Sequence, residues 1–90
     1  MSYMFYNCSS LTYLDLSNFE TGEVMNMQNL FGLCSKLKSI NIDKFETSKV
    51  TTMKNMFIFC TSLTSLNLSK FDTESVRDMS YMFSYSYNLQ

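Results

Sequence analysis

The chain has 90 residues and a formal net charge of −1, with 46% hydrophobic and 17% charged residues. This length accommodates one domain, the apolar content excludes a disordered tail, and no apolar run reaches the roughly 20 residues of a membrane span. A charge near zero gives no electrostatic basis for binding nucleic acid or an anionic membrane, and the absence of His excludes catalysis and zinc sites that depend on His.

The sequence repeats with a period of 26 residues. Four Phe residues share one position of the repeat, and three Cys residues share another, where Ser86 takes the fourth place. The invariant positions hold Phe5, Phe31, Phe57 and Phe83; Cys8, Cys34 and Cys60; Leu11, Leu37, Leu63 and Leu89; Phe19, Phe45 and Phe71; Thr21, Thr47 and Thr73; and Val24, Val50 and Val76. Such columns are expected when identical units stack, because each unit meets its neighbour through the same side chains.

Each repeat starts with a segment that is predicted to be a helix of about two turns. Its apolar residues follow the i, i+3, i+4, i+7 spacing of one helix face. They are Met27, Leu30, Phe31 and Cys34; Met53, Met56, Phe57 and Cys60; and Met79, Met82 and Phe83. Asn26, Thr52 and Asp78 stand directly before these sets, and all three are favourable N-caps. Helices are therefore predicted to start at residues 27, 53 and 79.

The next segment of each repeat is predicted to be a short strand with one buried face. Apolar and polar residues alternate there, with the apolar ones at Leu14 and Leu16, at Ile40 and Ile42, and at Leu66 and Leu68. A return loop, residues 44–50, closes the repeat. Alternating helices and strands predict parallel strands with right-handed crossovers. The predicted fold class is an α/β repeat solenoid, a right-handed stack with short parallel strands on one face and short helices on the other.

The strand segments carry the L-x-x-L-x-L pattern of leucine-rich repeats. It is found at Leu11, Leu14 and Leu16; at Leu37, Ile40 and Ile42; and at Leu63, Leu66 and Leu68. Together with the Phe, Cys, Thr, Val and Met columns, it makes the whole chain resemble the BspA-like leucine-rich-repeat surface proteins, also described as the mycoplasmal lipoprotein-associated repeat. The resemblance implies a secreted or surface-anchored microbial protein that binds host or matrix proteins, often as an adhesin, and it implies no catalytic residues.

The repeat boundaries predict a single leucine-rich-repeat segment, residues 1–90, of about 3.5 repeats. Complete repeats 26–51 and 52–77 lie between partial repeats 1–25 and 78–90. Neither end carries the polar cap that a solenoid needs, so we expect a fragment of a longer array whose apolar ends allow end-to-end self-association. The chain shows no signal peptide, and the expected location at the cell surface or outside the cell follows from the resemblance alone.

The Cys column predicts buried, unpaired thiols. Cys8, Cys34 and Cys60 are 26 residues apart on the apolar face, unlike metal ligands, which come in closely spaced pairs. A disulfide between stacked neighbours is the alternative.

Two further polar columns lie on the return loops. Glu20, Glu46 and Asp72 are predicted to form rim salt bridges with the neighbouring Lys44 and Lys70, and a cation bound by the carboxylates is the alternative. The hydroxyls of the Thr column are predicted to bond to local backbone groups in a turn. No cofactor and no metal site is predicted.

The outward strand positions are the candidate protein-binding site, because the sheet face of a solenoid offers a continuous surface to a partner. This face, hereafter the sheet face, consists of Tyr13, Asp15, Ser17, Ser39, Asn41, Asp43, Ser65, Asn67 and Ser69. Tyr13 is its one large aromatic residue. The alternative is a plain solvated sheet in which Asn41 and Asn67 bond side by side.

Several large apolar residues fall outside the core columns, on the flank of the predicted helices. They are Leu33, Phe59 and Tyr85 in one column, and Tyr3, Tyr6, Tyr81 and Tyr87 in the first and last predicted helices. They either become partly buried against the next repeat or form a patch for self-association.

The chain is therefore interpreted as a non-catalytic adhesion scaffold that binds a protein ligand, such as a host or matrix protein. No enzyme activity, nucleic acid or direct membrane insertion is expected. Two alternatives stay open. One is a structural spacer without a ligand of its own, and the other is an intracellular protein-interaction module, suggested by three unpaired Cys without a signal peptide.

Overall fold

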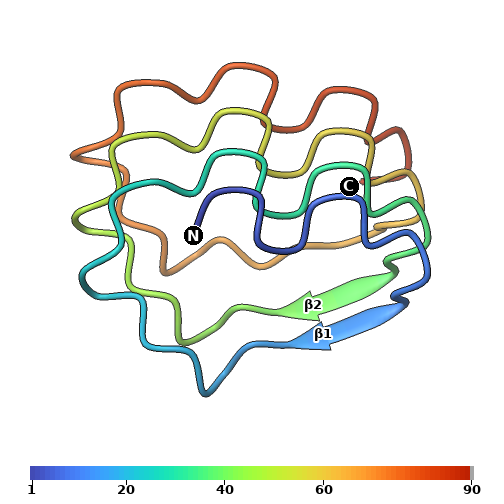
Figure 1. Ribbon diagram of the computed structural model, residues 1–90, viewed down its shortest axis with the longest axis horizontal. Coiled ribbons are helices and arrows are strands. Elements are labelled where there is room, and N and C mark those ends of the chain that lie inside the picture. Colours follow the sequence, from blue (N-terminus) through green and yellow to red (C-terminus); the bar gives the residue numbers. More distant parts are fainter. Residues whose placement is uncertain (90) are drawn as a thin grey trace.

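The computed structural model describes residues 1–89; Gln90, the last residue of the predicted partial repeat 78–90, lies outside the described residues. Two strands are present in the described part, β1 (Tyr13–Asp15) and β2 (Ser39–Asn41). They pair in parallel, with Leu14 opposite Ile40 (Figure 1). Within residues 1–89 no helix is long and apolar enough to cross a membrane.

The chain runs in successive coils that place equivalent residues of neighbouring repeats side by side (Figure 1). Isolated parallel bridges join Asn26 to Thr52 and Thr52 to Asp78, residues that are one repeat apart. The Phe column lies inside the coils, and its rings stack with centroid distances of 5.8, 5.2 and 5.7 Å from Phe5 to Phe83. Translation by one repeat thus superimposes the path of the backbone and the contents of the core.

The core is most complete in the two middle coils. Phe31, Phe57, Leu37 and Leu63 are fully buried, as are Met27, Leu30, Cys34, Val50, Met53, Met56 and Cys60. The equivalent residues of the outer coils are less buried, and Phe83 is 38% exposed. Burial of a side chain therefore depends on coils on both sides of it, as expected when neighbouring repeats supply the packing.

The predicted helices are wrong, because the described residues form turns in their place. We call residues 1–9, 27–35, 53–61 and 79–87 the turn segments. Alternate N–H groups of the first three segments donate to carbonyls of the next coil instead of to residues four positions back, which is the bond that defines an α-helix. The bonds of the second turn segment, 2.8–3.0 Å long, run from Met27 to Thr52, from Asn29 to Lys54, from Phe31 to Met56 and from Leu33 to Ile58.

The backbone angles show why a helix cannot form. Asn29, Leu33, Asn55 and Phe59 have φ values of 57°, 61°, 58° and 60°. A left-handed residue at every fourth position cannot be part of a right-handed helix. Between these residues, the N–H groups that do not cross to the next coil bond three residues back, as in β-turns. The i, i+3, i+4, i+7 spacing is kept because two successive turns point the same residues inward as two turns of helix do.

The residues predicted as N-caps accept backbone hydrogen bonds, but they start turns rather than helices. The side-chain oxygens of Asn26 and Asp78 accept the N–H of the second following residue at 2.8 and 2.9 Å, and Thr52 does so at 3.3 Å. This is the Asx- or ST-turn bond, and the following backbone makes no helical bond.

The predicted fold class is also wrong in its sheet. The parallel pairing near Leu14 and Ile40 is present, but the third predicted strand, around Leu66 and Leu68, is absent from the described residues. Both Leu side chains are half-buried and line a hollow of about 380 Å³ at the last coil. The described chain is therefore a stack of turn-rich coils with two short parallel strands and no helix, not an α/β solenoid.

The Thr column bonds across coils, so the predicted local bonds are wrong. The hydroxyl of Thr21 donates to the carbonyl of Glu46 at 3.1 Å and accepts its N–H at 2.8 Å. Thr47 makes the same pair of bonds with Asp72, at 3.0 and 2.8 Å. Each buried hydroxyl thus makes two bonds to the backbone of the next coil, in the place where two backbone-to-backbone bonds would otherwise join the coils.

The left-handed turns lead to a first stability prediction. Asn55→Ala is expected to lower the free energy of unfolding by about 1 kcal/mol, because Ala disfavours a positive φ. The side-chain oxygen of Asn55 has no hydrogen-bond partner, so its removal adds little. Asn55→Gly should be tolerated better than Asn55→Ala, since Gly adopts positive φ freely. Urea denaturation of both variants tests this, and an Ala variant more stable than the parent, as in a helix, would refute it.

Candidate binding surface

The structure exposes most of the predicted sheet face. Tyr13 is 53% exposed, and of the other eight residues only Ser17 and Asn41 are half-buried. The register of β1 and β2 places Tyr13 beside Ser39 and Asp15 beside Asn41. The third set, Ser65, Asn67 and Ser69, is exposed but belongs to no strand. The structure therefore pairs Tyr13 and Asp15 with Ser39 and Asn41 in a sheet, and it leaves Ser17, Asp43 and the third set outside it.

The polar side chains of this face are held by local bonds. Asp15 accepts the N–H of Ser17 at 3.0 Å. Hydrogen bonds from the backbone and from the side chain of Ser17 lower the pKa of the Asp15 carboxyl. Asn41 and Asn67 accept the N–H of the second following residue at 3.1 and 3.0 Å. The bonds found for the two Asn side chains thus run along each coil, not from one Asn to the other. The result is a row of polar side chains that are oriented by bonds to their own coils.

The Cys column links coils through its thiols. Cys34 Sγ donates to the carbonyl of Phe5, and Cys60 Sγ donates to that of Phe31, both at 3.1 Å. Ser86 makes the equivalent bond at 2.6 Å, which explains how Ser can occupy this column. All three Cys are free thiols. Burial raises the pKa of Cys34, and it raises the pKa of Cys60 to about 12.

This environment predicts unequal thiol reactivity. The thiolate is the nucleophile, so a buried thiol with a raised pKa reacts slowly. In the native chain at neutral pH, Cys8, which is only half-buried, should react with an aromatic disulfide reagent well before Cys34 and Cys60. Peptide mapping after timed labelling identifies the modified residues, and Cys8→Ser is the control that removes the fast phase. Equal rates at the three residues would contradict the buried column.

The predicted rim salt bridges are wrong for the described residues. Glu20, Glu46 and Asp72 are exposed, and none of them pairs with Lys44 or Lys70. The ion pair instead joins Lys49 and Glu23, with Nζ 2.9 Å from both carboxylate oxygens. Because both side chains are mostly exposed, the pair contributes about 1 kcal/mol or less. Residues 1–89 contain no group of three carboxylates or thiols placed to hold a metal ion.

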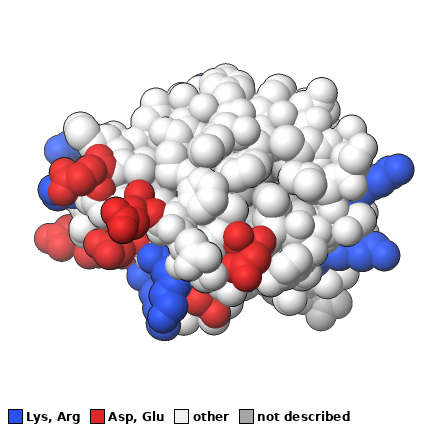
Figure 2. Space-filling view, turned by 60° about the horizontal axis from the view of Figure 1, so that its bottom comes forward, with Lys and Arg blue, Asp and Glu red and all other residues white. Residues whose placement is uncertain are grey.

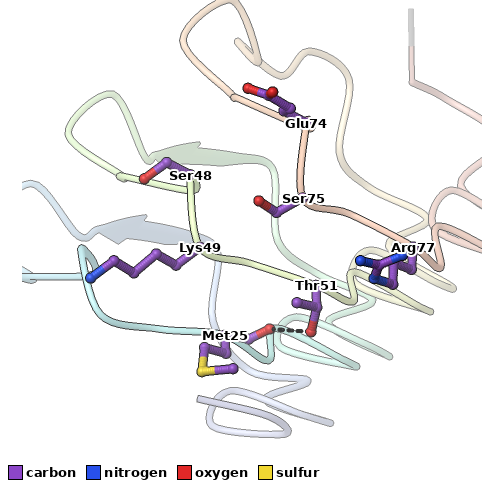
Figure 3. A pocket seen from close by; sticks show the side chains of 7 residues that line it. All are labelled: Met25, Ser48, Lys49, Thr51, Glu74, Ser75 and Arg77. Atoms are coloured by element: carbon purple, nitrogen blue, oxygen red, sulfur yellow. Dashed lines mark hydrogen bonds between the residues drawn. The ribbon is translucent and has the colours of Figure 1, made fainter.

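A groove that the sequence did not predict lies beside the return loops (Figure 3). Its volume is about 500 Å³, and it is lined by Met25, Ser48, Lys49, Thr51, Glu74, Ser75 and Arg77. The hydroxyl of Thr51 donates to the carbonyl of Met25 at 3.1 Å and so fixes the floor between two coils. Acidic and basic groups both line the groove, so it has no single charge preference. Only the 26-residue spacing of Met25, Thr51 and Arg77 could have indicated it.

The turn segments form a surface of a different kind. Among the described residues, nine of the eleven exposed large hydrophobic side chains lie on them. Lys54 is the single charged side chain in these four segments. On the face of the molecule that Figure 2 shows, the charged side chains lie at the two sides and along the lower part, and the rest of that face is uncharged. The sequence predicts the tyrosines on the flank of the segments that form turns here, and in the structure they are exposed to solvent.

The family described as "Mycoplasma protein of unknown function, DUF285" matches residues 1–90. No curated protein and no solved structure matches the chain.

Proposed function

We propose that this chain, which belongs to the Mycoplasma family DUF285, is a non-catalytic segment of a microbial surface protein and binds a protein ligand through its sheet face. The family match covers the whole chain and supports its membership of this family of unknown function. The finer assignment, to BspA-like adhesins of host or matrix proteins, rests on the resemblance of the repeat.

The observation that supports this function best is the separation of a constant interior from a variable exterior. Phe31 and Phe57, Cys34 and Cys60, and Thr21 and Thr47 occupy equivalent buried positions in neighbouring coils. The outward strand positions change between the first two coils, as Tyr13 beside Ser39 and Asp15 beside Asn41 illustrate, whereas Ser and Asn recur in the third coil at Ser65 and Asn67. A stack of this kind can change its exposed groups without repacking its core. Such a division suits a scaffold that presents exposed groups to a partner on a constant core.

The sheet face also has groups suited to a protein partner. Tyr13 is an exposed aromatic residue, and aromatic side chains anchor interfaces more often than small polar ones. Around it, Asp15 and Asn41 are oriented by bonds to their own coils. Pre-oriented polar groups lose less conformational entropy on binding than mobile ones.

The test is adherence of the displayed protein to immobilised host extracellular-matrix proteins. We expect Tyr13→Ala combined with Asn41→Ala and Asn67→Ala to reduce adherence, and we expect Lys44→Ala combined with Lys70→Ala to leave it unchanged. Apart from the half-buried Asn41, both sets change exposed residues, and thermal melting of each variant checks that the fold is retained. Unchanged adherence of the triple variant would overturn binding through the sheet face and favour a structural spacer.

A further inference from the structure

The charged side chains around the sheet face are separated along the direction of its strands. The segments that lead into the strands, with their equivalent in the third coil, form the strand-start side, residues 9–14, 35–40 and 61–66. The segments in which the strands end and the return loops follow form the strand-end side, residues 15–23, 41–49 and 67–75. The strand-start side holds Lys36 and Lys38 and no carboxylate, whereas the strand-end side holds seven of the eight carboxylates and three lysines. One side is therefore net positive and the other net negative.

The space-filling view shows the same separation. The charged side chains at its right side are all basic, and β1 and β2 start at that side in Figure 1 (Figure 2). The acidic side chains lie at the left and in the lower middle. A partner that lies along the strands therefore meets opposite charges at its two ends.

The two lysines of the strand-start side are accessible and carry free charges. Both are exposed, and they flank Leu37, which is fully buried. They belong to the second coil, which has a neighbouring coil on each side, and those coils have only Ser or Thr at the equivalent positions. The ion pair found within residues 1–89 joins Lys49 to Glu23, so neither lysine is neutralised by a carboxylate of the described chain.

The backbone beneath these lysines is fixed by bonds between coils. The N–H of Lys38 donates to the carbonyl of Thr12 at 2.8 Å. On the other side, the hydroxyls of Thr61 and Ser62 donate to the carbonyl of Ser35 at 3.3 and 2.7 Å. Only the lysine side chains are left to become ordered on binding, which limits the entropy lost.

We propose that the protein ligand of the sheet face lies with an acidic segment over Lys36 and Lys38 and with a basic segment over the strand-end side. This inference rests on the function proposed above and adds the chemistry of the partner. Complementary charge fixes the orientation of a partner and speeds its encounter with the surface. A uniform polyanion, such as a sulfated polysaccharide, is disfavoured because the carboxylates of the strand-end side repel any part that extends beyond the lysines. The occupant is therefore a polypeptide with separated charges.

The experiment is an NMR titration of the isotope-labelled 90-residue chain with synthetic peptides at low salt. The block peptide has a run of Glu and a run of Lys joined by a Gly-Ser spacer of about six residues, which spans roughly 20 Å when extended. The control peptide has the same composition with Glu and Lys alternating. The block peptide should bind more tightly and shift amide signals on both sides of the sheet face. High salt should abolish this binding, since exposed charges are screened.

Variants of two lysine pairs separate local charge from net charge. Lys36→Gln combined with Lys38→Gln should weaken binding of the block peptide by at least about threefold. Lys44→Gln combined with Lys70→Gln is the matched control, since it removes the same charge from exposed residues of the strand-end side. It should leave the binding at least as tight, because that side becomes more negative. Equal weakening by both pairs would overturn the inference.

Equal binding of the two peptides would also overturn it, as would a short heparin fragment that binds more tightly than the block peptide. Failure of this inference differs from failure of the proposed function. Loss of adherence in the triple sheet-face variant, together with equal binding of the two peptides, would overturn this inference alone. Selective binding of the block peptide, together with unchanged adherence of that variant, would overturn the proposed function and leave the charge complementarity of the face.

Discussion

Replacement of Phe57 by Ala is expected to lower the free energy of unfolding by about 3–5 kcal/mol. Phe57 is fully buried and stacks between Phe31 at 5.2 Å and Phe83 at 5.7 Å, so no neighbouring side chain can collapse into the space left behind. This loss is a large fraction of the roughly 5–15 kcal/mol that a whole domain has. Urea or thermal denaturation measures it. Phe57→Leu, which leaves a smaller cavity, keeps the comparison measurable if the Ala variant is unfolded.

The matched control is Phe83→Ala in the same column. Phe83 is 38% exposed and has a stacked neighbour on one side only in the described chain. Its loss should cost less than about 2 kcal/mol, because less apolar surface is removed from contact. Equal losses at the two positions would contradict a stack in which the middle coils are packed from both sides.

Thr47→Val is expected to cost about 2 kcal/mol. Thr47 is 2% exposed, and its hydroxyl both donates to and accepts from the backbone of Asp72. Val keeps the shape but removes two hydrogen bonds, each of which contributes about 1 kcal/mol. The cost should appear in chemical denaturation as a lower midpoint with an unchanged slope.

Thr73→Val provides the control for this effect. Thr73 belongs to the same column but is exposed, and the described structure gives its hydroxyl no cross-coil bond. Its replacement should change the stability by less than about 0.5 kcal/mol. A Thr73 variant as unstable as the Thr47 variant would show that the column stabilises each loop locally, as the sequence had suggested.

The core could be predicted from the sequence because stacking repeats the same environment. The columns of Phe31 and Phe57 and of Cys34 and Cys60 are buried where the 26-residue period places them. Repetition is a strong signal, because an apolar residue assigned to the wrong side of the backbone would be exposed in every coil. The helices could not be excluded by this signal, because inward-pointing residues have the same spacing in two β-turns as in two helical turns.

Two residues of the turn segments gave the clue that was missed. Asn29 and Asn55 lie inside the predicted helices, and Asn is the residue that tolerates a positive φ best after Gly. A helix of two turns is also unstable by itself, whereas the turns gain one hydrogen bond to the next coil at every second residue. Contacts between coils decide whether a segment forms turns or a helix. These contacts cannot be read from the sequence of a single repeat.

The geometry of the sheet face was predicted in part, whereas its role as a binding site stays a prediction. The exposure of Tyr13 and the pairing of Asp15 with Asn41 follow from alternation along a strand. The groove between Met25 and Arg77 was missed because its walls come from three separate repeats. The salt-bridge prediction for the acidic column was wrong for a related reason. The observed ion pair joins Lys49 to Glu23, one repeat away, and not Lys44 or Lys70 to the carboxylates next to them in the sequence.

The most direct test of the central claim, that the turn segments are left-handed turns bonded from coil to coil, is the sign of φ at Asn29, Leu33, Asn55 and Phe59, measured by NMR scalar couplings in the folded chain. The structure predicts positive φ at all four residues, together with nuclear Overhauser contacts between residues of neighbouring coils, such as Met27 and Thr52. Negative φ throughout, with the uninterrupted amide-to-amide contacts of a helix along residues 27–35 and 53–61, would contradict it.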